Sequence, residues 1–267
     1  VEAVAQSMTE AFHNPSALYA PAMRAEHALA DARRAIAATL GAQEKNVIFT
    51  SGGTESDNLA IWGRLAAMHH PGEVLYTAAE HEAVKNACLE AQARYGVAAR
   101  EIPLLPSGTV DLTALEGMLG PQTALICVMQ VCNETGVIMP VKEICDLRDR
   151  LAPQAAIHVD GVQGYLRVPF SFKETKVDSY ALSAHKIHGP KGVGALVLAD
   201  GALMTVRQNY ASRSQIMEGA QILSDSRLPL LGCVLNYASS RSPYGGYYGY
   251  GYGGYGRAYG EKREKAE

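Results

Sequence analysis

Short apolar runs alternate with helical segments along residues 22–198, and this alternation is the strongest constraint on what the chain can fold into. The runs expected to form strands are Asn46–Thr50, Glu73–Thr77, Ala99–Leu104, Thr123–Gln130, Ala155–Asp160, Asp178–Leu182 and Gly194–Leu198. The segments expected to form helices are Ala22–Leu40, Glu55–His69, His81–Tyr95, Leu112–Leu119 and Val141–Leu151, with Thr54 as a cap. Strands that alternate with helices predict an α/β architecture with a mostly parallel sheet.

The composition excludes several classes of protein. The chain has 267 residues, 48% of them hydrophobic, and a net charge of -3, so broad nucleic-acid binding is not expected. No apolar run is long enough to span a bilayer, and residues 1–40 do not read as a signal peptide. The five cysteines include no CxxC pair, which argues against a disulfide framework or a zinc site. We therefore expect a cytoplasmic protein without bound metal.

Polar residues gather in three segments that follow predicted strands. Thr50–Asn58 carries Ser-Gly-Gly-Thr before a helix, an arrangement suited to binding a phosphate, although an ordinary capped helix start would also explain it. Asp160 ends an apolar strand, where a carboxylate can pair with a protonated ring nitrogen or simply cap a helix. Ser183–Gly192 holds two lysines and two histidines, either as a solvated basic loop or as a site for a Schiff-base lysine.

Five segments, in this order, resemble motifs of the class V aminotransferases, which are pyridoxal-phosphate (PLP) enzymes, and in particular the cysteine desulfurases. They are Phe49–Ala60, Glu80–Val84, Val131–Val137, His158–Gln163 and Ser183–Gly192. The resemblance covers about residues 1–197. It implies the large PLP-binding domain of fold type I, with a mostly parallel sheet.

The resemblance also implies roles for individual residues. Lys186 would carry the cofactor as an internal aldimine and then move protons, with Lys191 as the competing candidate. Asp160 would keep the pyridine nitrogen protonated, and His81 would stack on the ring and assist acid–base steps. The other cofactor-binding positions are Asn133 and Gln163 on the ring hydroxyl side, and Gly53, Thr54, Ser183 and His185 at the phosphate.

The implied activity is PLP-dependent removal of sulfur from L-cysteine, the reaction that supplies iron–sulfur cluster assembly. A homodimer and a sulfur-acceptor protein are the implied partners. Family members also have an N-terminal strand and a small C-terminal domain with a catalytic cysteine and a carboxylate-binding arginine, and neither is found here. Cys233 lies in an apolar run, as a buried core cysteine would. We therefore expect a truncated chain with little or no sulfur release; the alternative is a non-catalytic PLP-binding remnant or fusion.

The C-terminal part of the sequence has a different character. Residues 198–238 are expected to form a strand (Ala199–Gln208), a helix (Ser212–Ser224) and a second strand (Leu228–Asn236). Residues 239–267 contain seven of the fourteen tyrosines, interleaved with glycines, and are expected to be a disordered tail. This order resembles the end of bacterial capsular-polysaccharide tyrosine autokinases. It implies a tail that is phosphorylated by a tyrosine kinase acting in trans, since the chain has no nucleotide-binding loop.

Overall fold

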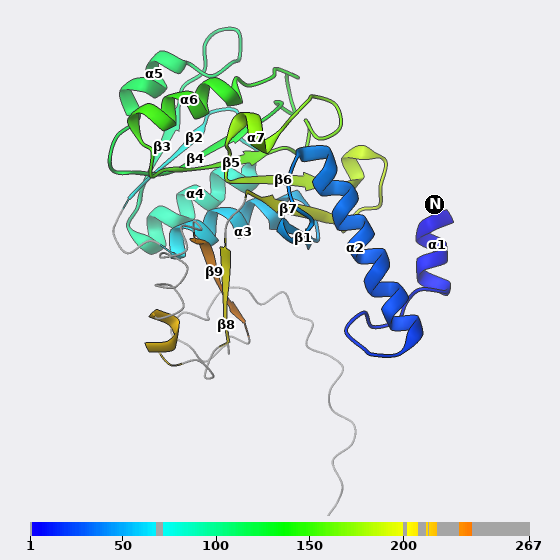
Figure 1. Ribbon diagram of the computed structural model, residues 1–267. Coiled ribbons are helices and arrows are strands. Elements are labelled where there is room, and N and C mark those ends of the chain that lie inside the picture. The colour runs from blue at the N-terminus through cyan, green and yellow to red at the C-terminus, as the bar shows by residue number, and fades with distance from the viewer. Residues whose placement is uncertain are drawn as a thin grey trace, which may run out of the picture.

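The computed structural model describes residues 2–67, 72–199, 202–207, 212, 214–217 and 230–236 (Figure 1). Within these residues the chain forms a seven-stranded sheet and a separate two-stranded sheet. Five segments of the sequence prediction lie wholly or partly outside the described residues: the end of the helix Glu55–His69, part of the strand Ala199–Gln208, most of the helix Ser212–Ser224, the start of the strand Leu228–Asn236, and the tail 239–267.

The large sheet has the strand order β1-β7-β6-β5-β4-β2-β3. Its strands are β1 (Val47–Thr50), β2 (Glu73–Thr77), β3 (Ala98–Ile102), β4 (Thr123–Met129), β5 (Ala156–Asp160), β6 (Ser179–Ser183) and β7 (Gly194–Leu198). Only β7 runs antiparallel to its neighbours, and the other strands are parallel to one another. The predicted α/β fold with a mostly parallel sheet is therefore confirmed. The parallel strands also bring their carboxyl ends to one edge of the sheet.

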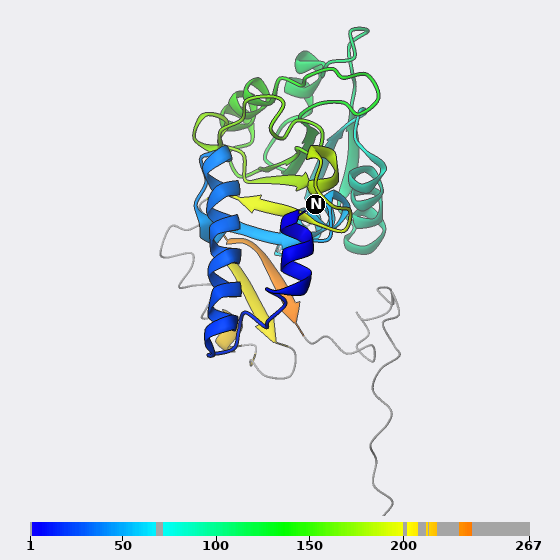
Figure 2. The same ribbon diagram turned by 90° about the vertical axis from the view of Figure 1, so that its right-hand side faces the viewer.

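Helices cover both faces of this sheet (Figures 1 and 2). Helices α3 (Gly53–Ala66) and α4 (Glu82–Tyr95) pack on one face. Helices α5 (Leu112–Met118), α6 (Val141–Leu151) and α7 (Phe172–Thr175), with the end of α2 (Ala20–Leu40), pack on the other. Alternate residues of β5 serve the two layers: Ile157 and Val159 join the core beneath α6, whereas His158 faces α3. No helix among the described residues is both long and apolar enough to cross a membrane.

Three helix starts differ from the sequence prediction. Helix α2 begins at Ala20, two residues before the predicted Ala22. Helix α3 begins at Gly53 and Gly52 is its N-cap, so Thr54 lies inside the first turn and does not cap it. The reason is that Gly52 has φ 156° and ψ −177°, a conformation essentially restricted to glycine. The carboxylate of Glu55 then accepts hydrogen bonds from the Ser51 amide (2.6 Å) and hydroxyl (2.5 Å). Helix α4 likewise begins at Glu82, one residue later than predicted, with His81 as the cap.

Some elements have no counterpart in the prediction. These are helix α7 and the 3-10 turns η1 (Glu44–Asn46) and η2 (Ala184–Ile187). Helix α1 (Glu2–Thr9) precedes α2 at the start of the chain. Strands β8 (Ala202–Arg207) and β9 (Leu230–Asn236) match the two predicted C-terminal strands and pair in parallel, with β9 beside α3 (Figure 1). A helical turn at 214–217 lies within the predicted Ser212–Ser224 helix.

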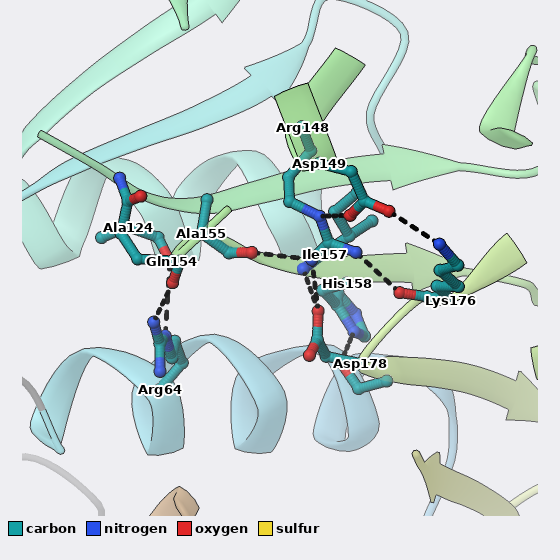
Figure 3. Close-up of polar contacts among 11 residues, drawn as sticks. Arg64, Ala124, Arg148, Asp149, Gln154, Ala155, Ile157, His158, Lys176 and Asp178 are labelled. Atoms are coloured by element: carbon teal, nitrogen blue, oxygen red, sulfur yellow. Dashed lines mark hydrogen bonds and ion pairs between the residues drawn. The ribbon is translucent and has the colours of Figure 1, made fainter. Parts of the chain in front are cut away.

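Arg148 of α6 links the amino-terminal ends of β5 and β6 (Figure 3). Its side chain is only 8% exposed, and its guanidinium donates to the carbonyls of Ala155 and Lys176, each at 2.8 Å. It also pairs with Asp178 at 3.2 Å and Asp149 at 2.8 Å. Asp178 in turn accepts a hydrogen bond from the Ile157 amide at 2.7 Å. The guanidinium thus joins α6, the start of β5 and the start of β6.

Arg64 of α3 makes a similar link from the opposite face of the sheet (Figure 3). It donates to the carbonyls of Ala124 (3.3 Å) and Gln154 (2.8 Å). The two arginines therefore fix the amino-terminal ends of β4, β5 and β6. These contacts do not involve the carboxyl ends of the strands.

We predict that Arg148→Ala lowers the free energy of unfolding by about 3–5 kcal/mol, because it leaves the Asp178 carboxylate and two carbonyls without their partner. Arg150→Ala is the matched control: its ion pair with Glu116 is exposed, so the loss is expected to stay below about 1 kcal/mol. Urea unfolding of the two variants tests this. Equal losses for both would contradict the structural role given to Arg148.

Candidate active site

A cavity of about 220 Å³ lies at the carboxyl edge of the parallel strands. All nine residues singled out by the sequence line it: Gly53, Thr54, His81, Asn133, Asp160, Gln163, Ser183, His185 and Lys186. Asp160 and Ser183 are the last residues of β5 and β6, and the others come from the segments that follow β1, β2, β4, β5 and β6. The structure thus brings the set together. What each residue does there stays a prediction.

Four further residues line the cavity that sequence reasoning did not single out: Asp57, Met129, Val131 and Val162. Asp57 had a detectable signal, because it lies four residues after Gly53 in a helix and therefore on the same face. Lys191, the alternative lysine, is exposed and does not line the cavity.

One end of the cavity is formed by the turn between β1 and α3. The backbone amides of Gly53 and Thr54 have no hydrogen-bond acceptor among the described residues. A Cβ at Gly53 would come within 2.5 Å of the Val162 side chain, so only glycine fits there. The Ser183 hydroxyl lies next to this turn and is 2.8 Å from Nδ1 of His185. Free amides at a helix start beside a hydroxyl and an imidazole suit an anion such as a phosphate.

Asp160 lies at the end of β5 and is 6% exposed. One of its oxygens accepts a hydrogen bond from the Val162 amide at 2.9 Å. Burial, followed by the nearby Asp57 carboxyl group, raises the pKa of Asp160 to about 7. No lysine or arginine among the described residues forms an ion pair with it. The cavity therefore holds a carboxylate that a cationic ligand would stabilise.

Asp57, His158 and Ser179 form a buried chain of polar groups beneath Asp160. Asp57 lies 3.1 Å from Nε2 of His158, and Nδ1 of the same ring lies 2.8 Å from the Ser179 hydroxyl. Burial raises the pKa of Asp57 to about 8 and lowers that of His158 to about 4. Burial thus favours the neutral form of both groups. The chain of contacts links α3, β5 and β6 at the floor of the cavity.

Glu80 fixes the loop that carries His81. One carboxyl oxygen accepts hydrogen bonds from the Thr77 hydroxyl (2.6 Å) and the Met129 amide (2.7 Å), which tie this loop to the end of β4. The other oxygen is buried and has no partner among the described residues. Burial raises the pKa of Glu80 to about 8, which favours the protonated form of its carboxyl group at neutral pH. Sequence reasoning did not single out Glu80, because its partners lie on two different strands.

His81 is held by its position as the N-cap of α4. Its Nδ1 accepts a hydrogen bond from the Ala83 amide at 3.1 Å. An Nδ1 that accepts leaves the proton of the neutral ring on Nε2. The ring can therefore offer a donor to a group bound in the cavity.

Lys186 lies on the 3-10 turn η2, immediately after β6. His188 ends the turn in a left-handed conformation (φ 68°), and the Gly189 amide donates to the Ala184 carbonyl at 2.8 Å. A Cβ at Gly189 would lie 2.9 Å from Ala184, so a side chain at this position would crowd the turn. The lysine is thus presented to the cavity from a tightly closed turn.

We predict that Glu80→Gln removes a pH dependence of stability. Because the folded state raises the pKa of Glu80 from 4.5 to about 8, folding retains a proton that the unfolded chain releases. The free energy of unfolding of the parent should therefore fall between about pH 4.5 and 8, by up to about 1.4 kcal/mol per pH unit from this group. The variant, which cannot ionise here, should lose less stability over this range.

Urea unfolding at pH 5, 6, 7 and 8 measures this difference. Glu82→Gln, on the exposed start of α4, is the control and should follow the curve of the parent protein. A Glu80→Gln variant with the same pH dependence as the parent would mean that Glu80 is ionised in the folded state.

Comparison with known proteins identifies the family of this chain. The model of the aminotransferase class-V family matches residues 1–218. A cysteine desulfurase of Cereibacter sphaeroides is 40% identical over 202 residues, which cover 75% of this chain and 52% of the relative. Among solved structures, a NifS-like protein has a TM-score of 0.71 at 30% identity, covering 75% of this chain and 55% of that one.

A second solved structure, SspA in complex with cysteine, has a TM-score of 0.69 at 32% identity and covers 74% of this chain and 56% of that chain. The chain spans about half the length of the curated relatives it matches. The match to the family model extends to residue 218, past the 197 at which the motif resemblance ends. This chain belongs to the class-V aminotransferase family, whose members depend on PLP.

Proposed function

We propose that this chain is the PLP-binding part of a cysteine desulfurase and that the cavity at the carboxyl edge of the sheet is its cofactor site. The observation that carries the proposal is the convergence of Lys186, Asp160, His81 and the Gly53–Thr54 turn on one cavity. Similarity to cysteine desulfurases supports L-cysteine as the substrate. A second copy of the chain and a sulfur-acceptor protein are proposals that rest on the resemblance. A cytoplasmic location is a proposal that rests on the composition and the resemblance.

The donor set of the cavity fits PLP. The free amides of Gly53 and Thr54, with Ser183 and His185 beside them, would hold the phosphate. The carboxylate of Asp160 would pair with the ring nitrogen, which supplies the positive charge that the described residues do not. Asn133 and Gln163 would reach the ring hydroxyl, and Lys186 supplies the amine to which the cofactor aldehyde attaches.

When bound, PLP supplies an electron sink that stabilises negative charge at the α-carbon of an amino acid. Residues of the chain would hold the ring nitrogen in its protonated form, move protons to and from the substrate, and orient the bound groups. Asp160 would hold the proton on the ring nitrogen, because pairing with a cation favours its ionised form. Lys186 would move a proton at its Nζ to or from the substrate, and His81, as a donor through Nε2, would orient the bound groups.

The four described cysteines, Cys88, Cys127, Cys132 and Cys145, are all buried. None of them is presented to the cavity, so the described residues do not identify a sulfur acceptor. The side chain of Cys233, on β9, lies outside the described side chains. We therefore assign the cavity to cofactor binding and to chemistry at the α-carbon, and the step that takes the sulfur away is not assigned to a residue.

The tyrosine-rich tail remains a separate prediction. Phosphorylation of several of its seven tyrosines would make the tail strongly acidic, because each phosphate adds between one and two negative charges, as a rough guide. The likeness of this C-terminal part to the end of a tyrosine autokinase likewise stays a proposal based on the order of its segments.

We predict that the purified protein incubated with PLP absorbs visible light and that borohydride fixes the cofactor on Lys186. Lys186→Ala should abolish the fixed label, because Lys186 is the one lysine among the described residues that lines the cavity. Lys191→Ala is the control and should label as the parent does. Peptide mass spectrometry reads the position. Label on Lys191, or label that persists in Lys186→Ala, would overturn the assignment.

We predict that Asp160→Asn binds PLP but slows exchange of the α-hydrogen of L-cysteine by about 100-fold or more, because the ring nitrogen loses the partner that keeps it protonated. NMR in D₂O follows this exchange without requiring sulfur release. Asp146→Asn, on the exposed side of α6, is the control and should exchange at the parent rate. Unchanged exchange in Asp160→Asn would exclude this role for the carboxylate.

A further inference from the structure

Arg167 does not line the cavity, yet it contacts two residues that do. Its Nη1 donates to the carbonyl of Gln163 at 2.9 Å and lies 3.4 Å from the side-chain oxygen of the same residue. Its Nη2 donates to the main-chain carbonyl of Lys186. One guanidinium therefore bridges the segment that follows β5 and the turn that follows β6.

The backbone that leads to Arg167 is tightly determined. The Tyr165 amide donates to the Gly161 carbonyl at 2.8 Å, and the Arg167 amide donates to Gly164 at 2.9 Å. Leu166 takes a left-handed conformation with φ 61°, which turns the chain before Arg167. The arginine is thus carried on a folded turn rather than on a free loop.

Two glycines allow this turn to approach the core closely. A Cβ at Gly161 would lie 1.8 Å from the Tyr180 ring, and one at Gly164 would lie 2.0 Å from the side-chain oxygen of Gln130. Tyr180 and Gln130 are themselves buried and hydrogen-bonded to each other at 2.6 Å. The position of the turn is therefore fixed from below, and Arg167 extends from a rigid base.

The turn that carries Lys186 gains most from such a contact. It is a single 3-10 turn, whose hydrogen-bond geometry is weaker than that of an α-helix. The last carbonyls of any helical turn lack partners within it, and a cation placed there is stabilising. The Arg167 guanidinium supplies both a donor and a positive charge at the carbonyl of the cavity lysine itself.

A lysine could not make the same contacts. Two acceptors, on separate segments, are reached by two nitrogens of one planar group, whereas an ammonium is a single point of charge. The bridge therefore depends on the shape of the guanidinium as well as on its charge.

We infer that Arg167 is a positioning residue of the cavity: it holds the Lys186 turn against the Gln163 segment, so that the lysine amine and the Gln163 side chain keep a fixed relation. This inference rests on the proposed function, because in that function Lys186 and Gln163 both bind PLP. Arg167 is exposed, so its bridge acts on local geometry more than on global stability.

The test compares Arg167→Met and Arg167→Lys with the parent protein. Arg167→Met removes both contacts, and capture of PLP by Lys186, followed by stopped-flow absorbance, should slow by about ten- to a hundredfold. The visible circular dichroism of the bound cofactor should weaken as well, because the lysine no longer holds it in one orientation. Arg167→Lys keeps the charge and should recover only part of both signals. Arg150→Ala, an exposed arginine away from the cavity, should behave as the parent does.

The outcomes separate the inference from the function on which it rests. If the parent fails to capture PLP through Lys186, the proposed function fails. If the parent captures PLP and Arg167→Met captures it at the same rate with the same dichroism, the inference alone is overturned. Complete recovery by Arg167→Lys would also overturn it, because charge without the bridge would then suffice. If Arg167→Met does not fold, Arg167→Gln, which keeps one donor, takes its place under the same criteria.

Discussion

The rest of the site depends on one physical constraint, which is that the carboxyl group of Asp160 is buried at the end of β5. A carboxylate that is 6% exposed and has no lysine or arginine paired with it among the described residues is costly to ionise. Burial also raises the pKa values of the neighbouring carboxyl groups of Asp57 and Glu80 to about 8, which favours their neutral forms. A cation bound beside Asp160 would therefore favour the ionised form of its carboxyl group. A protonated pyridine ring is a cation of suitable shape and charge.

The two ends of the central strands have separate tasks. At the amino ends, Arg148 and Arg64 satisfy carbonyls and carboxylates of neighbouring segments and fix how β4, β5 and β6 begin (Figure 3). At the carboxyl ends, the same strands present the residues that line the cavity. Because a strand is stiff over five residues, fixing one end also limits movement of the other. In the same way, Arg167 links the segments after β5 and β6 at the cavity side.

Much of this arrangement could be predicted from the sequence, and the reasons are physical. The strands were recognisable because they alternate with helices, and parallel strands must bring the residues after their carboxyl ends to a common edge. The nine residues were recognisable because glycines, hydroxyls, an aspartate and a lysine follow those strands in a family order. The start of α3 was predicted wrongly because Thr54 is a good cap by residue type, whereas the conformation of Gly52 moves the cap two residues earlier.

Contacts between distant segments left no pattern in the sequence. Asp57 and His158 are separated by 101 positions, and neither neighbourhood indicates the other. Glu80, which follows β2, accepts a hydrogen bond from the Met129 amide at the end of the neighbouring strand β4. Arg167 donates to the Lys186 carbonyl from a turn in which Leu166 has a left-handed conformation. Such pairs follow from how the layers pack, which local preferences do not determine.

A crystal structure of this chain with PLP is the most direct test of the central claim. The account predicts electron density continuous from Nζ of Lys186 to the cofactor, with the ring nitrogen about 2.6–3.0 Å from a carboxylate oxygen of Asp160 and the phosphate on the amides of Gly53 and Thr54. Density attached to Lys191, or a cofactor whose ring nitrogen lies away from Asp160, would contradict it.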